Sequence, residues 1–129
     1  MISRRAALAA AALCLALAAP AFAAAPIPFT PQAFEAAEAA GKPILVHITA
    51  SWCVTCKAQK AIVRELTADP AFVDLTIFAV DFDAQKSVMA AFKARERSTM
   101  IVFKGASEVG RATGDTDAAS IKALLSKAL

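Results

Sequence analysis

A pair of cysteines separated by two residues stands between a predicted strand and a predicted helix, and this junction restricts the fold more than any other feature of the chain. Residues 44–49 are apolar and largely β-branched apart from His47, which is typical of a strand covered on both faces. Residues 54–66 have apolar side chains at helical spacing. The segment Trp-Cys-Val-Thr-Cys-Lys that joins them places Cys53 at the start of a helix and Cys56 one turn later.

This placement predicts redox chemistry. A sulfur atom at the start of a helix faces unpaired backbone N–H groups and a partial positive charge, which favours the thiolate over the thiol. We therefore predict that Cys53 is an exposed nucleophile and that Cys56 resolves the mixed disulfide formed on it. A purely structural disulfide is the weaker alternative, because so short a loop stabilises a fold little. A structural zinc site would need two more ligands, and residues 24–129 offer only His47 besides carboxylates.

The start of the chain has the pattern of a secretory signal. Arg4 and Arg5 precede an apolar run at 6–19, and an Ala-Phe-Ala cleavage sequence follows. An uncleaved anchor is disfavoured, because the run is shorter than the roughly 20 apolar residues that cross a bilayer. The paired arginines leave a twin-arginine route open. We expect a cleaved signal peptide at 1–23, a domain at 24–129, periplasmic localisation, and no stable membrane insertion after cleavage.

The charge pattern argues against nucleic acid as a partner. The chain has a formal net charge of +3, and removal of the two leader arginines lowers it to +1. The sequence has no block of lysine and arginine and no stripe of alternating basic and aromatic residues. Cys14 lies inside the leader, directly after Leu13, and is interpreted as an apolar filler rather than a lipoprotein cysteine.

The rest of the chain alternates helices and strands and ends in a hairpin and a helix. Thr30 followed by Pro31 indicates a helix start, and Gly41 a helix end. Residues 26–28 are expected to form a linker, and the phenylalanines, Phe82 included, to pack in the core. The remaining predicted elements are strands at 75–80, 100–103 and 108–113, the last at the sheet edge with a bulge at Gly110, and helices at 85–92 and from Thr116 or Asp117 onward. This order predicts an α/β fold with a central mixed β-sheet flanked by helices on both faces.

With the strand, the Trp-Cys-X-X-Cys-Lys segment and the helix in this order, the chain resembles the thioredoxin superfamily. Residues 41–57 are most similar to the C-terminal periplasmic thioredoxin-like domain of the disulfide interchange protein DsbD, and residues 98–105 to the loop and strand that face its active site. The resemblance implies a thioredoxin fold and an enzyme that reduces or interchanges protein disulfides through Cys53 and Cys56. It implies no cofactor beyond this redox-active pair. The implied partners are protein thiols and disulfides and a DsbD-like membrane electron donor.

The resemblance also assigns roles around the cysteines. His47 stands where relatives usually have a buried aspartate that accepts the proton of the resolving cysteine. An imidazole can accept this proton too. The alternative is that His47 is a neutral core residue with one hydrogen bond and no catalytic role. Ser98 stands in the place of the family's cis-proline. Because a cis bond before another residue costs roughly 3–4 kcal/mol, the Arg97–Ser98 peptide is predicted to be trans. Trp52, Arg97, Ser98 and Thr99 are expected to bind substrate.

Two other functions stay open at this stage. Cys53, Cys56 and Met100 are soft ligands that suit copper(I), so the chain could instead carry metal. The serine in place of the proline could also admit a metal or an iron-sulfur cluster in a dimer. A non-catalytic thioredoxin-fold interaction module is disfavoured by the intact cysteine pair.

Overall fold

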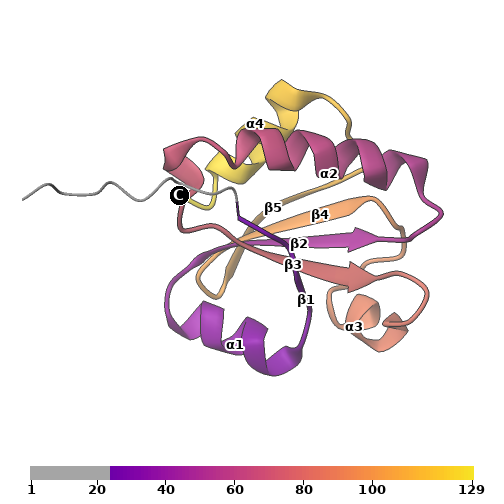
Figure 1. The fold of residues 1–129 in the computed structure, drawn as a ribbon. Coiled ribbons are helices and arrows are strands. Elements are labelled where there is room, and N and C mark those ends of the chain that lie inside the picture. The colour runs from indigo at the N-terminus through magenta and orange to yellow at the C-terminus, as the bar shows by residue number, and fades with distance from the viewer. Residues whose placement is uncertain (1–23) are drawn as a thin grey trace, which may run out of the picture.

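A five-stranded mixed sheet runs through the middle of the computed structural model, which describes residues 24–129 (Figure 1). The strands are β1 (Ile27–Pro28), β2 (Pro43–Thr49), β3 (Thr76–Asp81), β4 (Thr99–Lys104) and β5 (Ser107–Thr113). Their order is β1-β3-β2-β4-β5. The first three of these are parallel, and β4 and β5 are antiparallel to their neighbours. The predicted edge position of the last strand is therefore confirmed.

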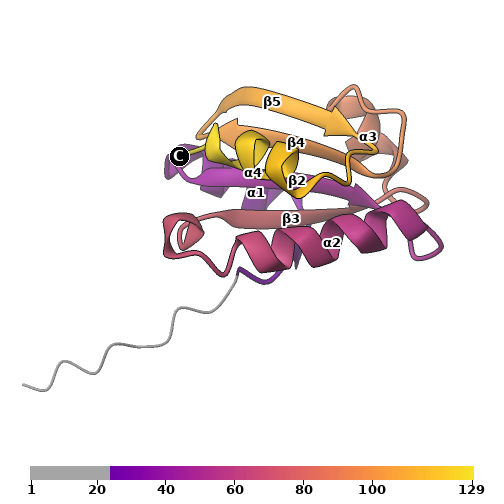
Figure 2. The same ribbon diagram turned by 90° about the horizontal axis from the view of Figure 1, so that it is seen from above.

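Helices cover both faces of this sheet, as predicted. The helices α2 (Val54–Leu66) and α4 (Ala118–Ser126) lie beside each other on one face (Figure 2), and α1 (Pro31–Ala39) and α3 (Lys86–Ala91) lie on the other (Figure 1). A short 3₁₀ helix (Pro70–Phe72) leads into β3. Alternate residues of the central strand β2 face opposite layers, and both layers are apolar, which explains its continuous burial.

Two apolar cores result, one on each face of the sheet. Leu45 and Val63 belong to the core beneath α2 and α4, together with Ile121 and Leu125 of α4. Phe34 belongs to the core beneath α1 and α3, where it packs against other phenylalanine rings at centroid distances of 5.2–5.8 Å. These cores fix the position of β2, whose end carries the cysteine segment.

The helix boundaries follow the predicted caps. The hydroxyl of Thr30 accepts the N–H of Ala33 at the start of α1. At the start of α4 the cap is Asp117, not Thr116, and its carboxylate accepts the N–H of Ser120. The backbone of Gly41, just after α1, has a φ of +68°, a conformation that favours glycine.

Two expectations need correction. Residues 26–28 are not only a linker, because Ile27 and Pro28 form β1 and pair with β3. Pro28 is tolerated there because β1 is an edge strand, and the chain is held by the bond from the N–H of Phe29 to the carbonyl of Ala79. The bulge of β5 lies at Val109, one residue before the predicted Gly110.

The predicted signal peptide at 1–23 lies outside the described residues. Among the helices that the structure does describe, none is long and apolar enough to cross a membrane.

Candidate active site

The two cysteines lie at the end of β2, where the chain turns into α2. Cys53 is the N-cap residue of α2, and its sulfur accepts the backbone N–H of Cys56 at 3.1 Å. The two residues form a disulfide, with their Cα atoms 5.3 Å apart. The predicted position of the first sulfur, at the amino end of a helix, is thus confirmed.

The exposure of Cys53 differs from the prediction. Its exposed fraction is 5%, and that of Cys56 is 0%. The two cysteines form a small apolar cluster with Ala50, and the partly buried ring of Phe82 packs against this cluster, which explains their low exposure. Solvent exposure still distinguishes the two cysteines, because Cys53 reaches the surface in the disulfide form and Cys56 does not.

Trp52 lies on the surface beside the disulfide, where the sequence placed it. The indole is 54% exposed, and its Nε1 donates a hydrogen bond to the carboxylate of Asp83 at 2.8 Å. The ring of Phe82 meets it edge to face, with centroids 6.1 Å apart. The guanidinium of Arg97 lies 4.6 Å from the indole centroid, which brings two of the predicted substrate-binding residues together.

The loop before β4 approaches the same edge of the sheet. Ser98 has a φ of +54°, in the left-handed region that side chains other than glycine rarely adopt. Its hydroxyl donates to the carbonyl of Arg97, and the peptide between the two residues is trans, as predicted. The hydroxyl of Thr99 donates to the carbonyl of Glu96 and lies 3.0 Å from the hydroxyl of Thr113. Thr99 is only 2% exposed, and its backbone pairs with Ile48 of β2 and with Thr113 of β5.

His47 is buried on the face of β2 that lies under α2. The ring is 4% exposed, and its Nε2 lies 2.8 Å from the side-chain oxygen of Gln59. Burial lowers the pKa of His47 below its ordinary value, the bond with Gln59 opposes that shift, and the positive charge of Lys60 adds to it. The structure therefore favours a neutral imidazole, which is the form able to accept a proton.

Sequence reasoning missed two contributors to this site. Gln59 is completely buried and bonded to His47, although as a glutamine in a predicted helix it resembles a surface residue. The available signal was its spacing, three residues after Cys56 and four before Val63, both of which are buried. The predicted core position of Phe82 is only partly correct, because its ring lies between the core and the surface, where it packs against the cysteine cluster and Trp52.

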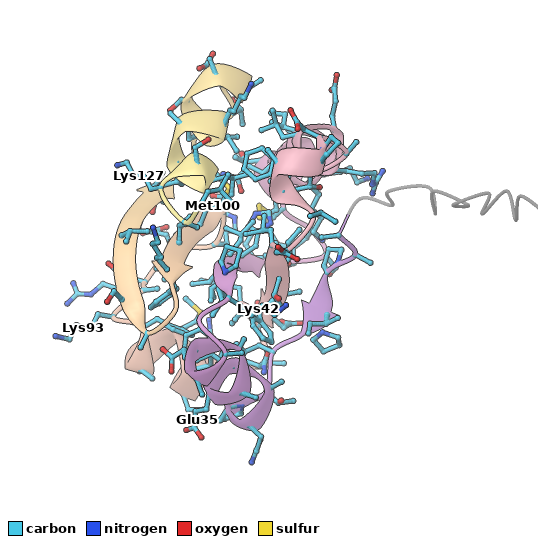
Figure 3. The ribbon with its side chains drawn as sticks, turned by 90° about the vertical axis from the view of Figure 1, so that its left-hand side faces the viewer. Glu35, Lys42, Lys93, Met100 and Lys127 are labelled. Atoms are coloured by element: carbon cyan, nitrogen blue, oxygen red, sulfur yellow. A yellow bond between two sulfur atoms is a disulfide. The ribbon has the colours of Figure 1, made fainter. Side chains whose placement is uncertain are left out.

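Met100, suggested as a copper ligand, belongs to a different apolar cluster from the two cysteines. Met100 is completely buried in the core beneath α2 and α4, and Figure 3 shows it inside the molecule while Lys93 and Lys127 extend outward. Over residues 24–129, no group of three or more histidine, cysteine, aspartate or glutamate side chains is arranged to hold a metal ion.

Comparison with known proteins gives a consistent result. Residues 25–127 match the family described as Thioredoxin. The chain is 34% identical to a thioredoxin of Chlamydia muridarum over 84 residues, which are 65% of this chain and 80% of that protein. It is 32% identical to an H-type thioredoxin of Fagopyrum esculentum over 83 residues, 64% of this chain and 70% of the relative.

Solved structures share the fold. The crystal structure of Trxlp from Edwardsiella tarda is similar with a TM-score of 0.76 and 37% identity, over 78% of this chain and 98% of that one. The thioredoxin of Malassezia sympodialis gives a TM-score of 0.71 at 20% identity, over 84% and 93% of the two chains. These similarities confirm the predicted thioredoxin fold.

Proposed function

Because this chain belongs to the thioredoxin family, whose members exchange thiols and disulfides, we propose that it reduces or interchanges protein disulfides in the periplasm in the manner of a DsbD-type domain. The observation that supports this proposal best is the sulfur of Cys53 at the N-cap of α2, within 3.1 Å of a backbone N–H. Such a donor stabilises a thiolate more than a thiol.

The proposed reaction moves two electrons from the dithiol to a substrate disulfide. In the reduced enzyme, the Cys53 thiolate attacks one substrate sulfur, the substrate S–S bond breaks, and the other substrate sulfur leaves as a thiolate that takes up a proton. The Cys56 thiol then loses its proton and its sulfur attacks Cys53. This second step releases the remaining substrate thiolate and forms the Cys53–Cys56 disulfide seen in the structure.

In this scheme His47 accepts the proton of Cys56. The ring lies under α2, is favoured in its neutral form by burial, and is linked to the helix through Gln59. Its ring also lines a cavity of about 460 Å³ together with Lys60 and Arg64, so a proton has a route to solvent.

The surface around the disulfide fits the docking of an extended protein segment. Trp52 is exposed beside Cys53, and the neighbouring Val54 is 82% exposed. Arg97, above the indole, has a buried Nε without a hydrogen-bond partner among the described residues, which makes it available to a substrate carbonyl or carboxylate after a small movement.

Periplasmic location and the DsbD-type role are supported by the leader-like residues 1–23 and by the similarity of residues 41–57 to the DsbD domain. A reductase outside the cytoplasm needs electrons from across the membrane, so the proposal includes a membrane thiol-disulfide carrier as donor. Substrate reduction, rather than oxidation, is the proposed direction.

The test is reduction of insulin by the dithiol form, followed by trapping. A Cys56→Ser variant is expected to accumulate mixed disulfides on Cys53 with exported proteins, and a Cys53→Ser variant to trap none. Wild-type protein that fails to reduce insulin, or a reduction potential as high as that of a strong oxidant, would contradict the proposed reductase.

A further inference from the structure

Gln59 connects four segments of the site from inside the core. It lies on α2, one turn beyond Cys56, and none of its surface is exposed. Its Nε2 donates to the carbonyl of Ser98 at 3.0 Å and to the carbonyl of Asp115 at 2.9 Å. Its Oε1 lies 2.8 Å from Nε2 of His47 on β2. One side chain thus joins β2, α2, the loop before β4 and the loop before α4.

The two carbonyls determine which way the amide of Gln59 faces. A carbonyl oxygen only accepts hydrogen bonds, so both must face the amide nitrogen, which has two hydrogens to donate. The amide oxygen is therefore the atom that faces His47, and it too can only accept. Nε2 of His47 must then carry a proton, and Nδ1 remains as the one basic atom of the neutral ring.

The same side chain supports the unusual backbone of Ser98. The carbonyl of Ser98 accepts two hydrogen bonds, one from Gln59 and one from the N–H of Gly114 at 2.9 Å. A non-glycine residue persists in the left-handed region only where its surroundings hold it there. The first bond ties the loop that carries Arg97 to the middle of α2, and the second ties it to the loop that follows β5.

We propose that Gln59 is the positioning residue of this site, holding His47 in the tautomer protonated on Nε2 and holding the Ser98 loop in the shape that receives substrate. The inference rests on the proposed function for its effect on turnover. The predicted effect of Gln59 on the tautomer of His47 does not depend on the proposed function, because it concerns a hydrogen bond inside the protein. Gln59 touches neither substrate nor sulfur in this role and acts through His47 and the loop.

The first test reads the tautomer of His47 directly. Nitrogen NMR of the oxidised protein at neutral pH is expected to show protonation at Nε2 in the wild type and a mixture of tautomers in Gln59→Leu, a variant of similar volume without polar atoms. The matched control is Gln32→Leu on the exposed surface of α1, which should keep the wild-type signal. A wild-type ring protonated at Nδ1, or an unchanged tautomer in Gln59→Leu, would overturn the proposal.

The second test separates the two halves of the role. Gln59→Glu keeps an acceptor for His47 but replaces the two N–H donors to the carbonyls with at most one O–H, so it should retain protonation at Nε2 while raising KM for insulin. Gln59→Leu should in addition slow resolution of a mixed disulfide by roughly tenfold, because a misplaced proton acceptor loses part of the gain from general base catalysis. Equal KM values and equal resolution rates in the wild type, Gln59→Glu and Gln59→Leu would overturn the proposed role of Gln59.

These outcomes distinguish the inference from the proposed function. If wild-type protein fails to reduce insulin, the proposed function fails, while the tautomer measurement still decides whether Gln59 positions the ring. Thermal unfolding of each variant, measured alongside, shows whether a change in KM or in resolution rate accompanies loss of the fold.

Discussion

Trp52 is held beside the reactive disulfide by contacts from three other residues. Asp83 accepts its indole N–H, Phe82 meets its edge, and Arg97 lies over its face. The first two follow β3 and the third precedes β4, so the indole links the loops at this edge of the sheet. A large exposed aromatic side chain would otherwise be free to move, and these contacts restrict the orientation of the indole.

We predict that Asp83→Ala loosens the indole. The lost hydrogen bond is worth about 1 kcal/mol, so kcat/KM for insulin should fall roughly fivefold. The fluorescence of Trp52, the one tryptophan of the chain, should change at the same time. Asp74→Ala, at an exposed position away from Trp52, is the control and should alter neither. Unchanged fluorescence and turnover in Asp83→Ala would show that the bond does not orient the ring.

The lowered pKa of His47 predicts that the stability of the protein depends on pH. Because burial lowers its pKa in the folded protein, the unfolded chain binds this proton at higher pH than the native state does. The stability contributed by the neutral ring is fully present above pH 6.5, the ordinary pKa of histidine. It is lost as the pH falls from 6.5 through the lower pKa that His47 has in the folded protein.

We therefore expect the free energy of unfolding of the oxidised protein to fall between about pH 7 and pH 5, and to fall less in His47→Gln. The oxidised form is the correct sample, because its disulfide-bonded cysteines do not titrate. Denaturant unfolding at a series of pH values measures both curves. Parallel curves for the two proteins would mean that His47 is not the group responsible.

At the scale of elements, the segments with their own boundary signals could be predicted from the sequence. The helix α2 begins and ends where its periodicity indicated, and α1 begins at the predicted threonine cap. The strand β1 has no such signal. It consists of two residues, and it forms because the edge of β3 offers backbone partners and because Phe29 is anchored in the core.

In the candidate site, too, some residues could be placed from the sequence and others could not. The cysteine pair and Trp52 are local features of one segment, and the sequence was sufficient to place them. Gln59 gains its role from the carbonyls of Ser98 and Asp115, which are 39 and 56 residues away along the chain. Helical spacing indicates that Gln59 faces inward, but only the folded chain shows what it meets there.

The cap of α4 gives a prediction at this scale. Two neighbouring residues were candidates, and the structure assigns the cap to Asp117, whose carboxylate accepts the N–H of Ser120 at 2.8 Å. Asp117→Ala should lower the free energy of unfolding by about 1 kcal/mol, and Thr116→Ala should change it little. Denaturant unfolding of the two variants measures the difference. The opposite ranking would place the cap at Thr116.

At the scale of the whole molecule, the site depends on how tightly the layers pack. Helix α4 lies across β4 and β5 on the face that also carries α2, and the loop before it supplies the carbonyl of Asp115 to Gln59. A shift of α4 would therefore reach the active site through that loop. Gly110 on β5 allows α4 to pack closely against the strand, because a Cβ atom at this position would lie 2.8 Å from a methyl carbon of Leu124.

We predict that Gly110→Ala destabilises the fold by about 1–3 kcal/mol, since the added methyl group overpacks the contact with α4. The penalty should shrink in a Leu124→Ala background, where the clashing group is absent. A double-mutant cycle of unfolding free energies measures this coupling. Equal penalties in both backgrounds would mean that the contact with Leu124 does not limit residue 110.

The most direct test of the whole account is the pH dependence of alkylation of the reduced protein by iodoacetamide, with the modified cysteine identified by mass spectrometry. We predict that Cys53 reacts first, with a midpoint well below the roughly 8.5 of a free thiol, and that Cys56 reacts far more slowly. Faster reaction at Cys56, or a midpoint at Cys53 no lower than that of a free thiol, would contradict the assignment of Cys53 as the nucleophile.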